Sequence, residues 1–212
     1  MTVAVIDYGA GNLKSAAKAL SFAALETGNK VVVTADADVI RKADHIVLPG
    51  VGAFAECKRG LESLVGGVAA MREAVLEKGR PFLGICVGMQ LMATVGVEYG
   101  EHAGLDWIKG RVVKLAPNDS TLKIPQMGWN DLRLYKTAHP IFAGLKTGAH
   151  AYFVHSYHFI ADDPADVLAD VDYGGPVAAA IGRANMVGVQ FHPEKSQAVG
   201  LQLLDNFLRW RP

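Results

Sequence analysis

The first half of the chain alternates short apolar runs with segments of helical periodicity. Leu13, Ala16, Leu20 and Ala24 recur at three- and four-residue intervals, which places them on one face of a helix over residues 12–25. The other helices of this half are expected over residues 38–42, 54–77 and 87–95, and its strands over residues 3–8, 31–34, 46–48 and 82–85. A break near Gly66-Gly67 interrupts the second of these helices. Continuous apolar strands separated by helices predict a buried parallel sheet with right-handed crossovers.

The second half is patterned as short apolar runs joined by Gly, Pro and Asp turns, mostly without helices between them. Its strands are expected over residues 112–115, 131–135, 152–160, 167–171, 177–181 and 187–191. An amphipathic helix over residues 197–209 closes the chain, with Leu203, Leu204, Phe207 and Leu208 facing inward. Because no repeat or linker divides the chain, residues 1–212 are predicted to form one α/β domain with antiparallel strands added to a parallel sheet.

Composition narrows the class of protein. Half of the 212 residues are hydrophobic, and 21 basic residues balance 21 acidic ones without a basic stripe, so a nucleic-acid partner is not expected. The first residues, MTVAVIDYG, are typical of a strand rather than a signal peptide, and no apolar stretch approaches 18 residues. Two cysteines without a secretory signal indicate a reduced, cytoplasmic protein.

Cys86 lies where an expected strand ends and an expected helix begins, in the run GICVG over residues 84–88. This run has the form of a nucleophile elbow, with cysteine in place of serine between two glycines that permit a tight turn. The start of a helix favours a thiolate there, and the N–H of Val87 can donate to an oxyanion. Taken alone, the run is equally compatible with a small buried cysteine.

A thiol nucleophile needs a base and a group that orients the base. His192 follows an apolar strand in GVQFHPE, two residues before Glu194, and this offset places both side chains on the same side of an extended chain. The alternative is a turn that merely ends a strand. His155 and His158 are three residues apart and should point to opposite faces of a strand, so no metal site is expected.

Two further features of the sequence give weaker evidence for a functional site. Cys57 lies in a charged helical stretch without flanking glycines, and we expect it to be incidental. The run after the first strand places Gly9 and Gly11 as in a dinucleotide-binding loop, but Lys14 stands at the third glycine position, so the fingerprint fails. No cofactor is therefore expected.

The elbow and the late HPE sequence resemble those of the class I glutamine amidotransferases. Five runs resemble, more narrowly, the glutaminase subunits of imidazole glycerol phosphate synthases of histidine biosynthesis: DYGAGNL (7–13), LPGVGAF (48–54), IPQMGWN (124–130), YFVHSYH (152–158) and HPEKSQ (192–197). These runs span nearly the whole chain. The resemblance implies a flavodoxin-like, doubly wound and largely parallel sheet.

The same resemblance implies roles for individual residues. Cys86 would be the nucleophile, His192 the general base and acid, and Glu194 the group that orients it. Gly50, Val51 and Val87 would form the oxyanion hole. The substrate glutamine would be held by Gly52, Gln90, His155, Ser156 and Tyr157. A partner would be contacted by Asn12, Trp129, Asn130, Tyr152 and Lys195, although Trp129 could instead be a core residue.

The resemblance also implies a partner, a (βα)₈-barrel cyclase subunit that forms a heterodimer with this chain and uses its ammonia to make imidazole glycerol phosphate and AICAR. The chain itself offers no phosphate-cradling loop, which indicates that another chain binds the ammonia acceptor. Three alternatives stay open: a glutaminase serving anthranilate, carbamoyl phosphate or GMP synthesis; a non-catalytic binding subunit; and a plain cysteine hydrolase or peptidase.

Overall fold

An eight-stranded sheet runs through the computed structural model, which describes residues 1–212. The strand order is β2-β1-β3-β4-β14-β13-β12-β9. The five strands at one end are mutually parallel: β2 (Lys30–Thr34), β1 (Thr2–Ile6), β3 (His45–Gly50), β4 (Phe82–Cys86) and β14 (Met186–Val189). The three at the other end are antiparallel: β13 (Pro176–Arg183), β12 (Val167–Asp172) and β9 (Arg133–Leu134). The expected α/β architecture, with antiparallel strands added to a parallel sheet, is confirmed.

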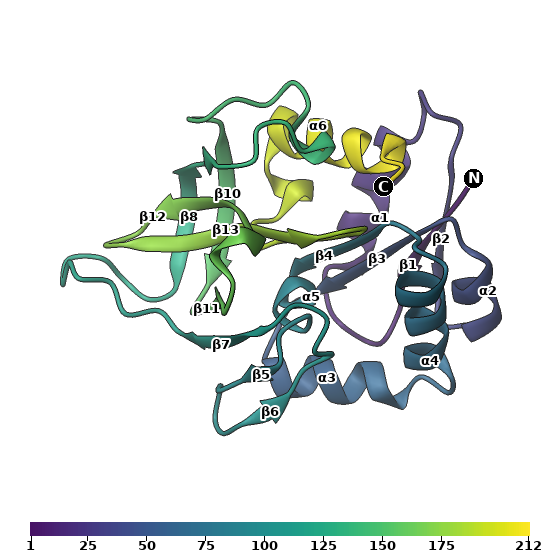
Figure 1. Cartoon of the computed structure of the whole chain (residues 1–212), viewed down its shortest axis with the longest axis horizontal. Coiled ribbons are helices and arrows are strands. Elements are labelled where there is room, and N and C mark those ends of the chain that lie inside the picture. Colours follow the sequence, from purple (N-terminus) through teal and green to yellow (C-terminus); the bar gives the residue numbers. More distant parts are fainter.

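Helices cover both faces of the parallel strands, with α6 and α3 on opposite sides of the sheet in Figure 1. The helices are α1 (Leu13–Ala23), α2 (Ala37–Lys42), α3 (Phe54–Ser63), α4 (Gly67–Arg72), α5 (Val87–Gln90) and α6 (Gln197–Arg209), and a π-helical turn (Glu73–Glu77) continues α4. Gly66 adopts φ 70° at the start of α4, a conformation that glycine accepts without strain, and the predicted break between two helices lies there. No helix is both long and apolar enough to cross a membrane.

Six further strands form two small sheets, one antiparallel and one mixed, at the left and lower centre of Figure 1. One sheet pairs β8 (Gln126–Asp131) with β10 (His150–His155). The other has the order β11-β7-β5-β6, from β11 (Tyr157–Ala161), β7 (Gly110–Lys114), β5 (Val95–Gly96) and β6 (His102–Ala103). Short 3₁₀ turns cover Pro140–Phe142, Pro164–Asp166 and Pro193–Lys195.

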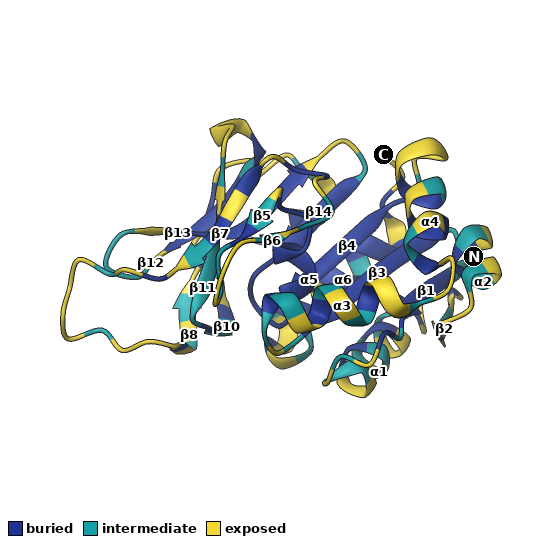
Figure 2. Cartoon of the chain, turned by 90° about the horizontal axis from the view of Figure 1, so that it is seen from below, coloured by how far each residue is buried: buried dark blue, intermediate teal, exposed yellow.

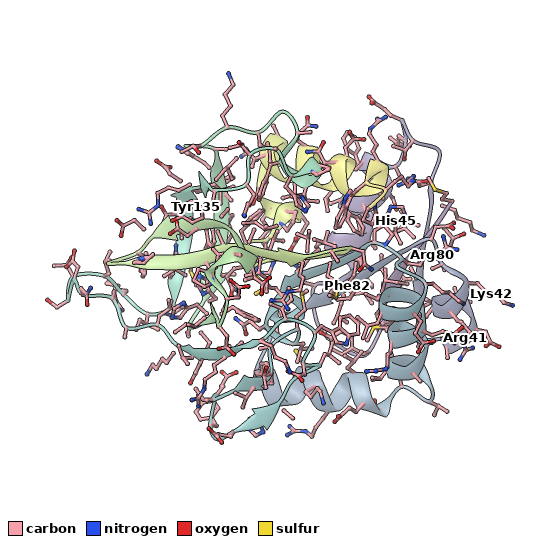
Figure 3. All side chains as sticks on the ribbon, in the orientation of Figure 1. Arg41, Lys42, His45, Arg80, Phe82 and Tyr135 are labelled. Carbon is pink, nitrogen blue, oxygen red and sulfur yellow. The ribbon has the colours of Figure 1, made fainter.

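One hydrophobic core joins the parallel and antiparallel parts. Figure 2 shows β3 and β4 buried along their length, whereas the loop after β7 and the outer helix faces are exposed. Phe82 lies near the middle of the molecule in Figure 3, where its ring packs edge-on against Trp107 with centroids 5.0 Å apart. Strands covered on both faces need apolar side chains on both, which explains their continuous apolar runs.

Three predicted elements differ from the structure. The strand expected over residues 152–160 is two strands in different sheets, because the chain bends at Ser156. The strand expected over 131–135 falls across the junction of β8 and β9. The helix expected over 87–95 ends at Gln90. The turns that follow it form hydrogen bonds with residues 104–108 instead, as in the bond from Leu105 N–H to the Leu91 carbonyl (2.7 Å). Long-range pairing overrides local propensity in all three places.

Candidate active site

Cys86 occupies the corner between β4 and α5, with φ 54° and ψ −112°. A positive φ is disfavoured for a residue with a Cβ, so the corner is strained. A Cβ added at Gly84 would lie 2.7 Å from the Gly88 carbonyl oxygen, and one added at Gly88 would lie 1.8 Å from that of Leu48. Only glycine fits at either position, as the pattern of the elbow predicted. Because α5 has only four residues, however, its dipole favours a thiolate less than the longer expected helix would.

His192 and Glu194 reach Cys86 because β14 lies next to β4 in the sheet. The Nδ1 atom of His192 is 2.7 Å from Oε1 of Glu194, and both side chains are almost fully buried. Glu194 does not continue an extended strand, as the two-residue offset suggested; it lies in the 3₁₀ turn Pro193–Lys195, which folds its carboxylate back onto the imidazole. The same carboxylate oxygen accepts a hydrogen bond from the Asn12 amide.

Opposing influences determine the pKa of His192. Burial of the imidazole lowers this pKa, but the adjacent Cys86 thiol and the Glu194 carboxylate raise it more, to about 9. These two neighbours therefore favour the protonated form of the ring. Its Nε2 is buried without a hydrogen-bond partner in the protein, so the proton there is available to a group that arrives at the sulfur.

A cavity of about 510 Å³ opens above these residues. The predicted residues that line it are Asn12, Val51, Gly52, Cys86, Val87, Gln90, His155, Ser156, Tyr157, His192 and Lys195. The structure adds Glu98, Pro125 and Val154 to them. Glu98 is the single carboxylate of the lining, and its Oε2 accepts from the N–H of Phe54 at 2.7 Å. Nothing in the sequence marks this glutamate, because it lies in a turn between two very short strands.

The segment from Pro49 to Gly52 leaves β3 beside the cysteine, since Gly50 is the register partner of Cys86. Two side chains donate hydrogen bonds to its carbonyl groups. The Tyr8 hydroxyl donates to the Pro49 oxygen at 2.6 Å, and the Cys57 thiol donates to the Val51 oxygen at 3.3 Å. Cys57 is therefore not incidental, because it helps to fix the backbone next to Cys86.

Two buried side-chain amides, those of Gln90 and Gln190, connect the cavity lining with Cys86. The Nε2 atom of Gln90 donates to the Tyr157 carbonyl and to Oε1 of Gln190, both at 3.0 Å. The Nε2 atom of Gln190 lies 3.6 Å from the sulfur of Cys86. Sequence reasoning identified Gln90 but missed Gln190. The only signal was its position in GVQFHPE, one residue beyond the apolar end of a strand that leads to the histidine.

The structure also defines the surroundings of three other histidines, His155, His158 and His45. The Nδ1 atom of His155 lies 2.8 Å from the Tyr157 carbonyl and its Nε2 lies 3.0 Å from Oε1 of Gln126; burial lowers its pKa to about 4. His158 lies on β11, in a different sheet from His155. His45 lies at the opposite, amino end of the sheet, near Arg80 in Figure 3. No three or more His, Cys, Asp or Glu side chains gather so that they could hold a metal ion.

Three of the predicted partner-contact residues form one cluster at the surface. Trp129 on β8 is 48% exposed and is the register partner of Tyr152 on β10; their rings meet edge-on at 5.8 Å. The Lys195 ammonium lies 5.6 Å from the centre of the Tyr152 ring. Asn130 donates its amide to the Asp172 carbonyl at 2.9 Å, whereas Asn12 faces the cavity and Glu194. Trp129 is thus not a core residue.

Comparison with known proteins agrees with this geometry. The family model "Glutamine amidotransferase class-I" matches residues 4–210. The chain is 59% identical over 214 residues to the imidazole glycerol phosphate synthase subunit HisH of Rhodospirillum rubrum, and 57% identical over 217 residues to that of Brucella abortus, with 100% of each chain covered in both cases.

Solved structures share the fold at lower identity. A crystal structure of a glutamine amidotransferase aligns with a TM-score of 0.72 and 18% identity, covering 98% of this chain and 97% of that one. A glutamine amidotransferase of Thermotoga maritima aligns with a TM-score of 0.65 and 17% identity, covering 92% of this chain and 76% of that one. The expected fold class is confirmed by these alignments.

Proposed function

The chain belongs to the class I glutamine amidotransferase family, and we propose that it acts as the glutaminase subunit of an imidazole glycerol phosphate synthase in histidine biosynthesis. Glutamine is hydrolysed to glutamate and ammonia, and the ammonia is passed to a cyclase subunit. The observation that carries this proposal is that Cys86 and His192 line one cavity and Glu194 contacts His192, in a chain 59% identical over its full length to a protein of that name.

The reaction follows from the arrangement of these three side chains. The Cys86 thiolate attacks the side-chain amide carbon of glutamine, and a tetrahedral oxyanion forms. His192 then donates its Nε2 proton to the departing amine, so that ammonia leaves and a glutamyl thioester remains on Cys86. The now neutral imidazole takes a proton from a water molecule, which attacks the thioester, and glutamate and the thiolate are released. Glu194 holds the ring through Nδ1 and stabilises its positive charge.

The cavity suits an amino acid that carries both charges. Glu98 supplies a carboxylate for the α-ammonium group, and the bend at Ser156, between His155 and Tyr157, supplies polar backbone for the α-carboxylate. Gln90 uses both amide hydrogens on Tyr157 and Gln190, so its Oε1 is left to accept from the substrate. This arrangement supports binding of glutamine with its side chain directed toward Cys86.

The oxyanion is held by backbone N–H groups on the two sides of Cys86. Val87 follows the nucleophile directly, and the peptide between Gly50 and Val51 lies opposite it, next to Gly52. Tyr8 and Cys57 hold the carbonyls of Pro49 and Val51, which leaves this intervening peptide as the part of the segment that can reorient. One oxyanion donor contributes about 10²–10³ in rate, so a reorientation alone would regulate the glutaminase by that factor.

The partner is the (βα)₈-barrel cyclase subunit. Ammonia is mostly protonated in water at neutral pH and then cannot act as a nucleophile, so a covered passage between the two subunits is required. Trp129, Asn130, Tyr152 and Lys195 lie on the β8–β10 side of the molecule and would contact the cyclase, with Asn12 at the rim of the cavity.

The test is glutamate production by the chain alone, by its complex with the cyclase, and by the complex with the cyclase's ligand. We expect the first two rates to be low and the third to be higher by about 10²–10³, the value of one oxyanion donor. Cys86→Ala should abolish the activity, His192→Asn should be nearly as damaging, and Glu194→Gln should lower it less, because it keeps shape and loses only charge. Equal rates in all three variants and the unaltered chain would contradict the triad.

A further inference from the structure

Gln190 is a fully buried polar side chain whose position is determined by the sheet. It follows Val189, the last residue of β14, and Val189 is the register partner of Ile85 on β4, so Gln190 lies beside Cys86. It does not line the cavity. Its amide contacts the sulfur of Cys86 (3.6 Å) on one side and the amide of Gln90 (3.0 Å) on the other. A buried amide is costly unless it is hydrogen-bonded, so both contacts matter for its retention.

The Tyr157 carbonyl, which ends this series of contacts, determines the direction of these hydrogen bonds. The carbonyl of Tyr157 can only accept, so Gln90 must present its amino group to it. The second hydrogen of that amino group points to Gln190, which must therefore present its carbonyl oxygen. The amino group of Gln190 is then left facing Cys86. One backbone carbonyl thus fixes the orientation of two side-chain amides and makes the sulfur a hydrogen-bond acceptor.

We propose that Gln190 is a positioning residue of the glutaminase site, which holds the Cys86 sulfur through its amino group and Gln90 through its carbonyl group. This inference rests on the proposed function. The sulfur is negatively charged when it attacks and again when water displaces it from the thioester, and a fixed N–H favours the charged form each time. His192 cannot serve as this fixed donor, because it gives its proton to the leaving ammonia. The amide of Gln190 does not titrate, so it remains a donor throughout the cycle.

Two substitutions separate the two contacts of Gln190. Gln190→Glu keeps the shape and keeps an oxygen for Gln90, but places an acceptor at the sulfur. Gln190→Met keeps the volume and removes both contacts. We expect kcat for glutamine hydrolysis, measured in the complex with the cyclase and its ligand, to fall about tenfold or more in both variants. KM should stay near the unaltered value in Gln190→Glu and rise several-fold in Gln190→Met, where Gln90 loses its acceptor.

The pH dependence gives a second signature. The new carboxyl group of Gln190→Glu can donate to the sulfur only while it holds a proton. Its activity, relative to the unaltered chain, should therefore decline as the pH rises, whereas the deficit of Gln190→Met should not follow the loss of such a proton. Gln202→Met serves as the matched control, because Gln202 lies on α6 and bonds to Asn206 instead (3.0 Å).

Alkylation by iodoacetamide tests the sulfur without glutamine. The chain is treated at pH 7, and peptide mapping separates Cys86 from Cys57, whose thiol bonds to the Val51 carbonyl and serves as an internal reference. We expect Cys86 to react about tenfold more slowly in both variants and Cys57 to be unchanged. Thermal unfolding verifies that the variants are folded. If Gln190→Met does not fold, the alkylation rate of Cys86 in Gln190→Glu decides the question.

Two outcomes would overturn the inference. One is alkylation of Cys86 at the unaltered rate in folded variants. The other is an equal rise of KM in both variants with kcat unchanged, which would show that Gln190 supports only the shape of the pocket. Absence of glutamine hydrolysis in the unaltered, ligand-bound complex would instead contradict the proposed function, and the alkylation comparison would still decide the role of Gln190.

Discussion

Replacing Cys86 with glycine should give a more stable protein than replacing it with alanine. Both variants lose the sulfur and its contacts, so their difference isolates the backbone. At φ 54° and ψ −112° a Cβ is strained by about 1–3 kcal/mol, and glycine releases this strain. Glycine also gives the unfolded chain about 1 kcal/mol of additional conformational freedom, which opposes the gain. The net expectation is that Cys86→Gly is more stable than Cys86→Ala by about 1 kcal/mol, or roughly 2–4 °C in Tm for a chain of this length.

The assay is urea unfolding of both variants, with the free energies of unfolding compared at equal slope. Ala4→Gly is the control, because Ala4 is fully buried in β1 and its φ is not positive. There glycine should be less stable than alanine by about 1 kcal/mol. Neither variant of Cys86 should hydrolyse glutamine. A Cys86→Ala protein that equals or exceeds Cys86→Gly in stability would refute the strained elbow.

Three further predictions concern binding and acid stability. Trp129→Ala should weaken association with the cyclase by about 2 kcal/mol in a binding titration, whereas Phe22→Ala, on α1 and 61% exposed, should not; an unchanged affinity would remove Trp129 from the interface. Glu98→Gln should raise KM for glutamine about tenfold with little change in kcat, because it loses the charge that we propose faces the α-ammonium. Glu101→Gln, at an exposed residue paired with Arg111, is its control. Burial, with a smaller effect of Arg211, lowers the pKa of His45 from 6.5 to about 4, so its neutral form contributes about 3 kcal/mol of stability above pH 6.5 that is lost as the pH falls through 4. His45→Gln should make the free energy of unfolding, measured by urea unfolding at each pH, depend less steeply on pH in this window. An unchanged dependence on pH would contradict the lowered pKa of His45.

The sequence by itself determined the features that depend on neighbouring residues. Apolar runs alternating with helical periodicity were enough to predict the parallel strands and α6, whose expected bounds of 197–209 match the structure. The glycines on both sides of Cys86 predicted the tight turn, because a close approach of backbone excludes every other residue. The short spacing of His192 and Glu194 predicted their contact even though a 3₁₀ turn, not an extended strand, produces it.

Tertiary structure decided what depends on residues far apart in the chain. The register of β14 against β4 places Gln190 beside Cys86, 104 positions earlier, and a turn between short strands brings Glu98 to the same cavity. The bend at Ser156 divides one apolar run between two sheets, although nothing in the run itself requires a division. Local patterns report how each segment buries its apolar side chains, whereas the partners of a buried polar group are chosen by sheet register and by packing over the whole fold.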